Sequence, residues 1–492
     1  MNLEATHTRH HPDFPAAAKE LLQDSQLRQN VRHATDIITA KRHQVVNEME
    51  DWQALRSAGS AIRQNALNHL DRYLAQFEAA CTLAGGRVHW AVDAAEANCI
   101  AIGLVKAQAA DEVLKIKSMT TEEIGLNDAL AQVGIRAHET DLAELIIQLG
   151  NDRPSHIVVP ALHKNRQQVR AIFQREMHLP DLCDRPEDLA EAARNFLREK
   201  FLRIPVAISG ANFLLAETGS VCIIESEGNG RMCLTLPRVL IAIAGIEKVI
   251  PRFADLEVFL QTLPRSATGA RMNPYNSIWT GIYPDDGPQE FHVILLDNGR
   301  SEILRDAEAQ QTLKCIRCGA CQNACPVYRQ TGGHAYESVY AGPIGAILTP
   351  QLDHFRQSAS LPYASSLCGA CYEVCPVQID IPEVLIHLRG QIVRRDQTTF
   401  AGKISPWNMG MRVAAAIFAS GDRLALAQHL VRIGQTPFIS RNGFVEHLPF
   451  QLEGWTQTRD LAPLPEHSFR QWWAARENTS GNSGRPGDGG VL

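Results

Sequence analysis

The first 85 residues have the spacing of apolar positions that is typical of amphipathic helices. Apolar and polar side chains alternate with a helical period in Ala16–Leu22, Val31–Ile38 and Ala61–Phe77. The segment Glu48–Arg56 belongs to the same pattern, and we expect it to pack on the domain that follows. The sequence therefore predicts an N-terminal helical region over residues 1–85.

Residues 86–300 have a different pattern, in which short apolar runs alternate with longer amphipathic runs. The short runs are expected to be strands: Cys99–Val105, His156–Pro160, Val206–Ser209, Val221–Glu225, Val239–Ala244 and His292–Asp297. The longer runs are expected to be helices: Ala109–Ile116, Leu142–Leu149, Gln167–Met177 and Glu187–Phe201. This alternation predicts an α/β domain with a mainly parallel sheet covered on both faces, whose functional loops follow the carboxyl ends of the strands.

The rest of the chain is predicted to be mostly helical. Residues 301–400 carry most cysteines on short helices, residues 401–477 read as helices and then loops, and residues 478–492 are expected to be a disordered tail. No run of about 20 apolar residues is present and the start lacks a signal-peptide pattern, so we expect no membrane span. A net charge of −6 over 492 residues argues against a nucleic-acid-binding surface.

Seven of the twelve cysteines fall in two related motifs. The first, Cys315–Pro326, has the spacing C-x2-C-x2-C-x3-C-P, and the second, Cys368–Pro376, repeats it without its first cysteine. This is the spacing of bacterial ferredoxins, in which the fourth cysteine of each motif ligates the other cluster. Zinc ribbons instead use two C-x2-C pairs. The motifs therefore predict iron–sulfur clusters and electron transfer.

The rule of crossed ligation assigns each cysteine to a cluster. The first cluster is expected on Cys315, Cys318, Cys321 and Cys375, and the second on Cys325, Cys368 and Cys371. Ser365 stands where the second motif lacks its first cysteine. The second cluster is thus one thiolate short: it is either [3Fe–4S], or [4Fe–4S] with serine, water, substrate or a partner residue on the fourth iron. A serine that simply caps the next turn fits the sequence equally well.

The other five cysteines are scattered along the chain and do not form a disulfide framework. Cys81, Cys99, Cys183, Cys222 and Cys233 are mostly in apolar surroundings, and we expect them to be buried thiols. Labile clusters and free thiols suit a reducing compartment. The sequence therefore predicts a cytoplasmic location.

Two polar turns between residues 208 and 231 are candidates for an anion site. Their candidate ligand-binding residues are Thr218, Gly219, Ser220, Asn229 and Arg231. Main-chain N–H groups, hydroxyls and a guanidinium suit a carboxylate or a phosphate, although two ordinary turns are the alternative. Gly228-x-Gly230 lacks the third glycine of the dinucleotide fingerprint, so we predict no classical NAD or FAD Rossmann site.

Further candidates lie earlier in the same domain. Lys117 and Ser118 precede a helix that Thr120 or Thr121 is expected to cap, which predicts an anion site or only a capped helix. Glu217 and His163 are the candidate proton acceptors. His156, by contrast, is expected to be a core histidine.

Several long motifs resemble those of the LUD-domain family of bacterial iron–sulfur proteins. They include KSMTTEEIGLN, PSHIVVPALHK, AETGSVCIIESEGNGR, CIRCGACQNACPVYR and SSLCGACYEVCPVQIDIP. The resemblance extends over about Asp51–Trp473. It implies a LUD α/β domain similar to the sugar-isomerase and CoA-transferase fold, joined to an α-helical two-cluster ferredoxin-like domain. The family has the same seven cysteines, so the resemblance also implies that Ser365 is a feature of the family.

The resemblance implies a role in oxidising L-lactate to pyruvate with two partners, a cysteine-rich CCG-type subunit and a smaller LUD-domain subunit. Because no flavin or nicotinamide site is recognisable, the leading prediction is an electron-transfer subunit of that complex. In a second reading the chain itself oxidises a 2-hydroxy acid at the open iron of the second cluster, with Glu217 or His163 taking the proton. In a third, the LUD domain is a binding or regulatory module for a small ligand.

Overall fold

The computed structural model describes residues 13–457 and 459–480 and divides into two compact units. The first unit is Met1–Ile392 and the second is Val393–Leu492. The boundaries predicted at residues 85, 300 and 400 stay predictions. Most of the predicted tail, residues 481–492, lies outside the described residues, whereas helix α22 (Phe469–Ser480) includes its first three positions.

Four helices begin the first unit, where the sequence predicts helices. They are α1 (Phe14–Leu21), α2 (Ser25–Asn47), α3 (Trp52–Asn68) and α4 (Leu70–Leu83). The carboxylate of Asp24 accepts the N–H of Leu27 at 2.9 Å and so caps the start of α2. Trp52 and Arg56 of α3 are buried. Helix α3 packs on strand β8 (Val249–Ile250) and on the 3-10 helix η2 (Gln310–Lys314), which directly precedes the first cysteine motif.

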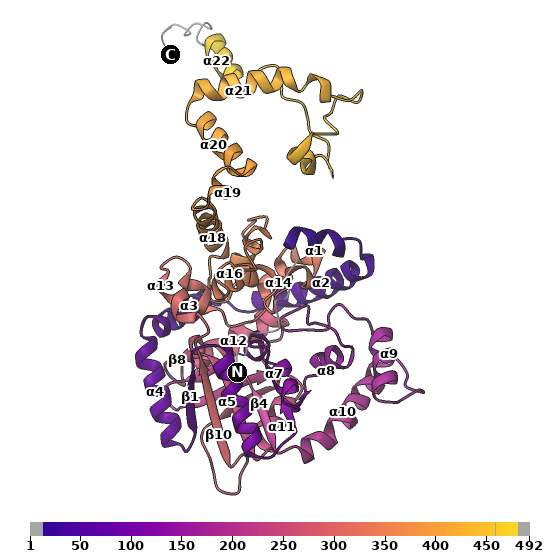
Figure 1. Ribbon diagram of the computed structural model, residues 1–492, viewed down its shortest axis with the longest axis vertical. Coiled ribbons are helices and arrows are strands. Elements are labelled where there is room, and N and C mark those ends of the chain that lie inside the picture. Colours follow the sequence, from indigo (N-terminus) through magenta and orange to yellow (C-terminus); the bar gives the residue numbers. More distant parts are fainter. Residues whose placement is uncertain (1–12, 458, 481–492) are drawn as a thin grey trace, which may run out of the picture. The chain divides into compact units, whose positions relative to one another are not determined.

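A parallel six-stranded sheet in the order β1-β10-β7-β4-β2-β3 forms the core of the first unit (Figure 1). Its strands are β1 (Arg87–Ala91), β2 (Glu112–Lys115), β3 (Arg136–Glu139), β4 (Val206–Ser209), β7 (Val239–Gly245) and β10 (Glu290–Leu296). The intervening helices are α5 (Ala94–Ala107), α6 (Met119–Glu123), α7 (Leu126–Gln132), α8 (Leu142–Leu149), α9 (Arg166–Glu176), α10 (Pro186–Arg203) and α11 (Asn229–Thr235). The predicted parallel α/β domain is therefore confirmed.

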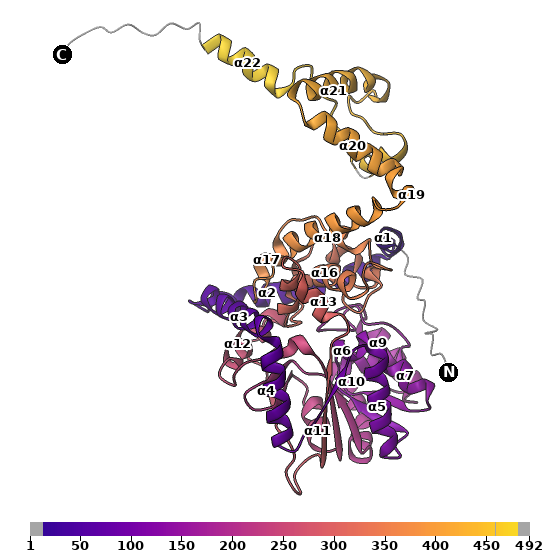
Figure 2. The ribbon, with the colours of Figure 1, turned by 60° about the vertical axis from the view of Figure 1, so that its left-hand side comes forward.

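Both faces of this sheet are covered, because successive strand residues point in opposite directions. Val206 and Ile208 of β4 pack in one apolar cluster with α5 and α7. Ala207, between them, packs in another cluster with Leu74 and Phe77 of α4. Figure 2 shows α4 on one side of the strands and α5 on the other. Strands buried on both faces must be apolar throughout, which is why the sequence shows β4 as a continuous apolar run.

A smaller four-stranded sheet in the order β8-β5-β6-β9 lies in the same unit. Its strands are β8 (Val249–Ile250), β5 (Phe213–Leu215), β6 (Ser220–Glu225) and β9 (Tyr275–Trp279). A 3-10 helix, η1 (Ile246–Lys248), precedes β8, and helix α12 (Leu256–Ala267) follows it. Strands β5 and β6 are an antiparallel hairpin in which Leu215 pairs with Ser220. The turns before and after β6 are therefore at opposite ends of one strand.

Three of the predicted elements are wrong. Cys99–Val105 is part of α5, because Ala97, Ala101 and Val105 are buried at helical spacing. Ala109–Ile116 contains strand β2 instead of a helix. His156–Pro160 is irregular, because His156 Nδ1 accepts the N–H groups of Val158 and Val159, each at 3.0 Å. His156 is buried, and burial lowers its pKa to about 3, as expected for a core histidine.

The cysteine segment follows β10 as a series of helices that belong to the first unit as far as Ile392, within the last of them. These are α13 (Arg300–Arg305), η2 (Gln310–Lys314), α14 (Ala320–Ala324), α15 (Tyr328–Thr331), η3 (His334–Tyr336), α16 (Gly342–Leu352), η4 (Leu361–Tyr363), α17 (Ala370–Val374) and α18 (Ile381–Asp396). Helices α14 and α15 pack on α2, and η2 packs on α3. The two ends of this unit's sequence are thus packed together.

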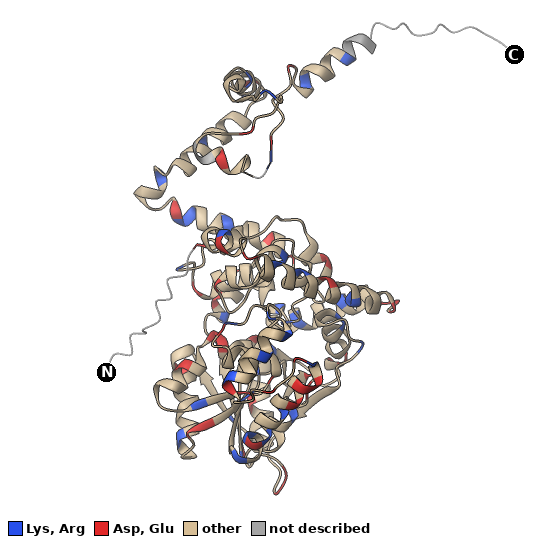
Figure 3. Ribbon diagram, turned by 90° about the vertical axis from the view of Figure 1, so that its right-hand side faces the viewer, with Lys and Arg blue, Asp and Glu red and all other residues tan. Residues whose placement is uncertain are grey.

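The second unit is helical and has few buried side chains. It contains α19 (Phe400–Lys403), α20 (Pro406–Phe418), α21 (Gly421–Gly434), η5 (Thr436–Phe438), η6 (Phe450–Trp455) and α22. Helices α20 and α21 pack on each other. Among the described helices of the whole chain, none is long and apolar enough to cross a bilayer. Figure 3 shows Lys and Arg interspersed with Asp and Glu along the ribbon.

Candidate iron–sulfur centre and adjoining pocket

The two cysteine motifs have the same backbone conformation. Arg317 and Gly319 of the first loop have φ values of 60° and 72°, and Leu367 and Gly369 of the second have 55° and 83°. Each loop leads into a five-residue helix, α14 or α17, and these two helices pack on each other. The repeat seen in the sequence is therefore also a repeat in structure.

The largest influences between the thiols fall within the two predicted groups, and a smaller one, that of Cys371 on the pKa of Cys321, joins the groups. Burial first, and then the neighbouring Cys375 and Cys315, raise the pKa of Cys318. Burial first, and then Cys325, raise the pKa of Cys371 to about 12. A cluster iron removes this cost, because a ligating thiol is bound as the thiolate. The grouping fits the predicted crossed ligation, which joins residues of both loops in each cluster.

Main-chain N–H groups are directed at sulfur in both groups. Arg317 N lies 3.4 Å from Cys315 Sγ, Tyr328 N lies 3.5 Å from Cys325 Sγ and Ile379 N lies 3.4 Å from Cys375 Sγ. Hydrogen bonds of this kind stabilise the negative charge on ligand sulfurs and tune cluster potentials. The donor set, the matching loops and these bonds together fit two iron–sulfur clusters.

Ser365 takes the place of Cys315 in the second loop. Its Oγ accepts the N–H of Leu367 at 3.1 Å, just as Cys315 Sγ accepts the N–H of Arg317. The side chain is half-buried. Ser365 Oγ therefore has the same orientation within its loop as a ligand sulfur, although the same bond would also cap a turn.

We expect Ser365→Cys to give the second cluster a fourth thiolate, because the loop already has the conformation of the Cys315 loop. Electron paramagnetic resonance after brief exposure to air measures the change. The wild type should lose an iron and develop a [3Fe–4S] signal, whereas the variant should develop none and should give its [4Fe–4S] signal once it is reduced. Ser366→Cys, at the exposed next position, is the control and should resemble the wild type. Equal loss of iron in both variants would contradict the expectation.

The two groups of thiols differ in exposure. In the first group Cys315, Cys318 and Cys375 are buried and Cys321 is half-buried; in the second group Cys325 and Cys371 are buried, and Cys368 is exposed. Leu367, which precedes Cys368, and Tyr372, which follows Cys371, are exposed as well. The second group therefore reaches the surface of the first unit through Cys368.

Two arginines of the N-terminal helices, the buried Arg56 and the half-buried Arg42, bind carbonyl groups near the first group. Arg56 donates to Cys375 O at 2.8 Å and to Tyr372 O at 2.9 Å, and Arg42 donates to Val374 O at 3.1 Å. Burial is the main cause that lowers the pKa of both arginines. These contacts hold the second loop in place through main-chain atoms, whatever its side chains are.

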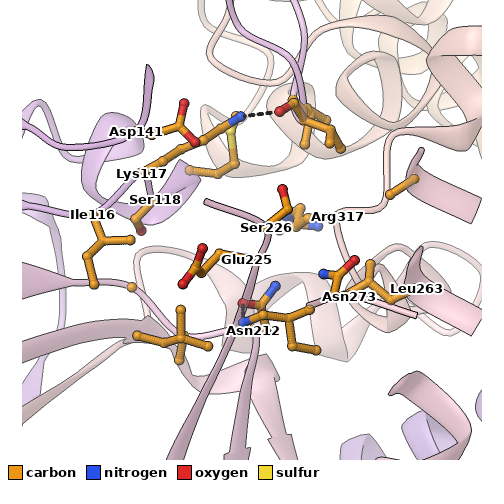
Figure 4. Close-up of a pocket in the computed structure, with 18 of the residues that line it drawn as sticks. Ile116, Lys117, Ser118, Asp141, Asn212, Glu225, Ser226, Leu263, Asn273 and Arg317 are labelled. Carbon is orange, nitrogen blue, oxygen red and sulfur yellow. Dashed lines mark hydrogen bonds between the residues drawn. The ribbon is translucent and has the colours of Figure 1, made fainter. Parts of the chain in front are cut away.

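A pocket of about 210 Å³ lies beyond the carboxyl ends of β2 and β4, beside the cysteine segment (Figure 4). Of the predicted site residues, Lys117, Ser118 and Asn229 line it. Its other polar lining residues include Glu225 and Ser226, which belong to the second of the two predicted polar turns, and Asp141. The sequence did not indicate Asn212, Lys248, Asn273 and Arg317, which also line it. Ser118, rather than Thr120 or Thr121, caps α6 by accepting the N–H of Thr121 at 3.3 Å.

Charged groups lie in and around this pocket. Lys117 Nζ donates to Val158 O at 2.9 Å, and burial lowers its pKa. Burial also lowers the pKa of Lys248 to about 7. Two carboxylates outside the lining have raised pKa values, because burial raises the pKa of Glu144 to about 8 and that of Glu227 to about 7. Among the lining residues, Lys248 can therefore exchange a proton near neutral pH.

The turn that contains Glu217 is at the other end of β6 from Asn229 and does not line the pocket. Glu217 Oε2 accepts the N–H of Phe253 at 2.8 Å. A Cβ atom on Gly219 would lie 2.1 Å from Cys81 N, so this turn packs directly on α4. The hydroxyls of Thr218 and Ser220 bond to each other at 2.6 Å. The structure thus does not bring the two predicted turns together in one site.

The remaining predicted residues also lie outside the pocket lining. Arg231 is exposed, and its guanidinium is 5.4 Å from the ring centre of Tyr275. His163 is buried, with Nδ1 2.8 Å from Ser155 Oγ and Nε2 3.0 Å from Asp152 Oδ2. Both ring nitrogens of His163 are therefore in use. Cys99 and Cys183 are exposed, which corrects the prediction that they are buried; Cys81, Cys222 and Cys233 are buried.

Two known domain families match the chain: LUD domain over residues 74–296 and 4Fe-4S dicluster domain over residues 311–379. Lactate utilization protein B of Oceanobacillus iheyensis is 42% identical, over 93% of this chain and 95% of its own. The chain belongs to the LUD-domain iron–sulfur protein family. Uncharacterized electron transport protein YkgF of Escherichia coli is 38% identical, over 96% of this chain and 98% of its own. The crystal structure of a DUF162 family protein from Deinococcus radiodurans covers 46% of this chain and 98% of its own, at 13% identity and a TM-score of 0.26.

The two domains of this LUD-domain iron–sulfur protein meet at the pocket. Every lining residue lies within the LUD match except Arg317, which lies in the dicluster match. Arg317 stands between Cys315 and Cys318 in the first loop. The spacing of the motif does not distinguish Arg317 from any other residue between two cysteines, so its place in the pocket is visible only in the structure.

Proposed function

We propose that the chain is the iron–sulfur electron-transfer subunit of a complex that oxidises L-lactate to pyruvate. The observation that carries the proposal is that the cysteine segment borders the pocket at one loop and reaches the surface at Cys368 of the other. Arg317 joins the pocket to the loop of the buried first group, and Cys368 brings the second group to the surface. The name of the relative from Oceanobacillus iheyensis supports lactate as the substrate of the complex.

Oxidation of lactate breaks one C–H bond and one O–H bond, forms the C=O bond of pyruvate, and releases two electrons and two protons. Each bound cluster would carry one electron, so two clusters pass the pair on singly. The proposed clusters are two [4Fe–4S], or one [4Fe–4S] and one [3Fe–4S]; the match to the dicluster domain supports iron–sulfur clusters. A cysteine-rich CCG-type subunit and a smaller LUD-domain subunit are the proposed partners, and the hydride equivalent is taken at a site that they complete.

The pocket favours this proposal over oxidation at the open iron of the second cluster. Cys325, Cys368, Cys371 and Ser365 do not line the pocket, whereas Arg317 of the first loop does. A substrate in the pocket would therefore lie beside the first cluster, at the buried end of the path.

Anaerobic purification of the chain alone and with its two partners tests the proposal. The chain alone should show iron–sulfur absorption and little lactate oxidation. With the partners, lactate should produce the paramagnetic signals of reduced clusters, recorded by electron paramagnetic resonance. High turnover by the isolated chain, or clusters that stay oxidised in the active complex, would refute an electron-transfer role.

A further inference from the structure

Two buried polar atoms in the pocket have no hydrogen-bond partner within residues 13–457 and 459–480. One is a donor, Arg317 Nη1, and the other is an acceptor, Asn229 Oδ1. The two side chains are only 9% and 8% exposed. Buried polar groups in folded proteins are nearly always paired, so unpaired ones that line a cavity indicate a polar ligand.

The rest of the Arg317 side chain is held firmly. Its Nη2 donates to Glu247 Oε1 at 3.3 Å, and its guanidinium lies 4.8 Å from the ring centre of Tyr340. Glu247 is shared with Arg300, whose Nε donates to Oε2 at 2.6 Å. Figure 4 shows Arg317 among the residues that line the pocket. The unpaired Nη1 therefore belongs to a fixed guanidinium, which is the group that proteins use most often to bind carboxylates.

The acidic residues of the pocket are engaged elsewhere. Glu225 Oε2 accepts the N–H groups of Glu227 and Gly228, both at 2.7 Å. Asp141 Oδ1 accepts the N–H groups of Ala143 and Glu144, at 3.0 and 3.2 Å, and so caps α8. Both carboxylates are bound by the main chain, so neither of them pairs with Arg317 Nη1.

We propose that Arg317 binds the carboxylate of a small hydroxy acid in this pocket and positions the acid beside the first cluster. Lys248 and Lys117 line the same pocket, and an amine donates hydrogen bonds to a carboxylate whether or not it is protonated. Arg317 N is 3.4 Å from Cys315 Sγ, so the residue that holds the acid also contacts a ligand sulfur of that cluster. The identity of the acid rests on the proposed function, but its binding is measurable without turnover.

Titration calorimetry on the anaerobic chain, with L-lactate and its uncharged amide, tests the proposal. The wild type should bind lactate and not the amide. Arg317→Gln should weaken lactate binding by about tenfold or more, because it removes a charge-assisted hydrogen bond. Arg389→Gln is the matched control. Arg389 donates to Pro362 O at 2.9 Å beside the second loop and does not line the pocket, so its loss should leave lactate affinity unchanged.

Iron content and visible absorption show whether each variant keeps its clusters. If Arg317→Gln loses them, Asn212→Asp replaces it, because Asn212 is outside both loops. An aspartate there can still accept the N–H of Ile224, which Asn212 Oδ1 accepts at 2.9 Å, and it adds a negative charge to the pocket. This variant should also weaken lactate binding.

The proposal is overturned if lactate does not bind the wild type. It is also overturned if cluster-loaded Arg317→Gln binds lactate with wild-type affinity. Where Arg317→Gln loses its clusters, wild-type affinity of Asn212→Asp overturns it in the same way. Equal binding of lactate and its amide overturns it too. Binding that depends on Arg317 in a complex whose clusters stay oxidised would support the carboxylate site and refute only the electron-transfer role. The two proposals can therefore fail separately.

Discussion

Cys375→Ala is expected to remove the first cluster and leave the second, although Cys375 belongs to the second motif. Cys375 is buried, and burial is the main cause that raises its pKa. Two main-chain N–H groups lower this pKa, and Cys315 is the thiol that raises it. Arg56 holds its carbonyl beside the first group. Cys325→Ala should have the opposite effect, since burial and, among thiols, Cys368 raise the pKa of Cys325.

Iron analysis and electron paramagnetic resonance of the reduced variants show which of the two clusters each variant has lost. Each variant should lose about half of the iron, and the two remaining spectra should differ from each other. Cys222→Ala, which removes a buried cysteine outside both motifs, should keep both clusters. Cys315→Ala, a change in the same motif as Cys325→Ala, serves as the comparison. If these two variants lose the same cluster, ligation is not crossed and each motif holds its own cluster.

Arg63→Met is expected to destabilise the first unit by about 3–5 kcal/mol, the usual effect of removing one side of a buried charged contact. Arg63 is 1% exposed, and burial lowers its pKa to about 10. It donates to the carbonyls of Leu313 at 2.8 Å, Val249 at 3.0 Å and Lys314 at 3.3 Å, and also to that of Glu247. Methionine would leave these carbonyls buried without a donor.

Denaturant unfolding of the cluster-loaded chain, followed by circular dichroism and by visible absorption, measures the loss. Arg72→Met is the control, because Arg72 is an exposed arginine on the next helix. That variant should change the unfolding free energy by less than about 0.5 kcal/mol. A similarly small change for Arg63→Met would mean that the four carbonyls find other donors.

The sequence predicts the strands of the sheet where burial makes them apolar throughout. Strands β4, β7 and β10 were expected nearly as they are, because they lie in the middle of the sheet. Strands β1 and β3 were missed, because they are the sheet's two edges and contain Arg87 and Arg136. Polar residues at strand ends make such short segments look like loops.

The cysteine spacing is informative because the chemistry of a cluster fixes it, whereas the pocket depends on the directions of distant strands. The two polar turns around β6 are close in sequence, and only the hairpin direction shows that they are at opposite ends. Arg317 and Lys248 are far apart in sequence and meet at the pocket through packing. A local sequence pattern cannot predict that two residues so far apart in sequence line the same pocket.

The contact between Arg56 and Cys375 also sets an order of events during synthesis. These residues are 319 positions apart, so helix α3 leaves the ribosome long before its carbonyl partners exist. The contact of Arg42 with Val374 O likewise cannot form before Val374 has been synthesised. Contacts so distant in sequence form late in folding. The N-terminal helices can therefore close over the cysteine loops only after both loops are made, which leaves iron and sulfide access to the first group while the chain is still being translated.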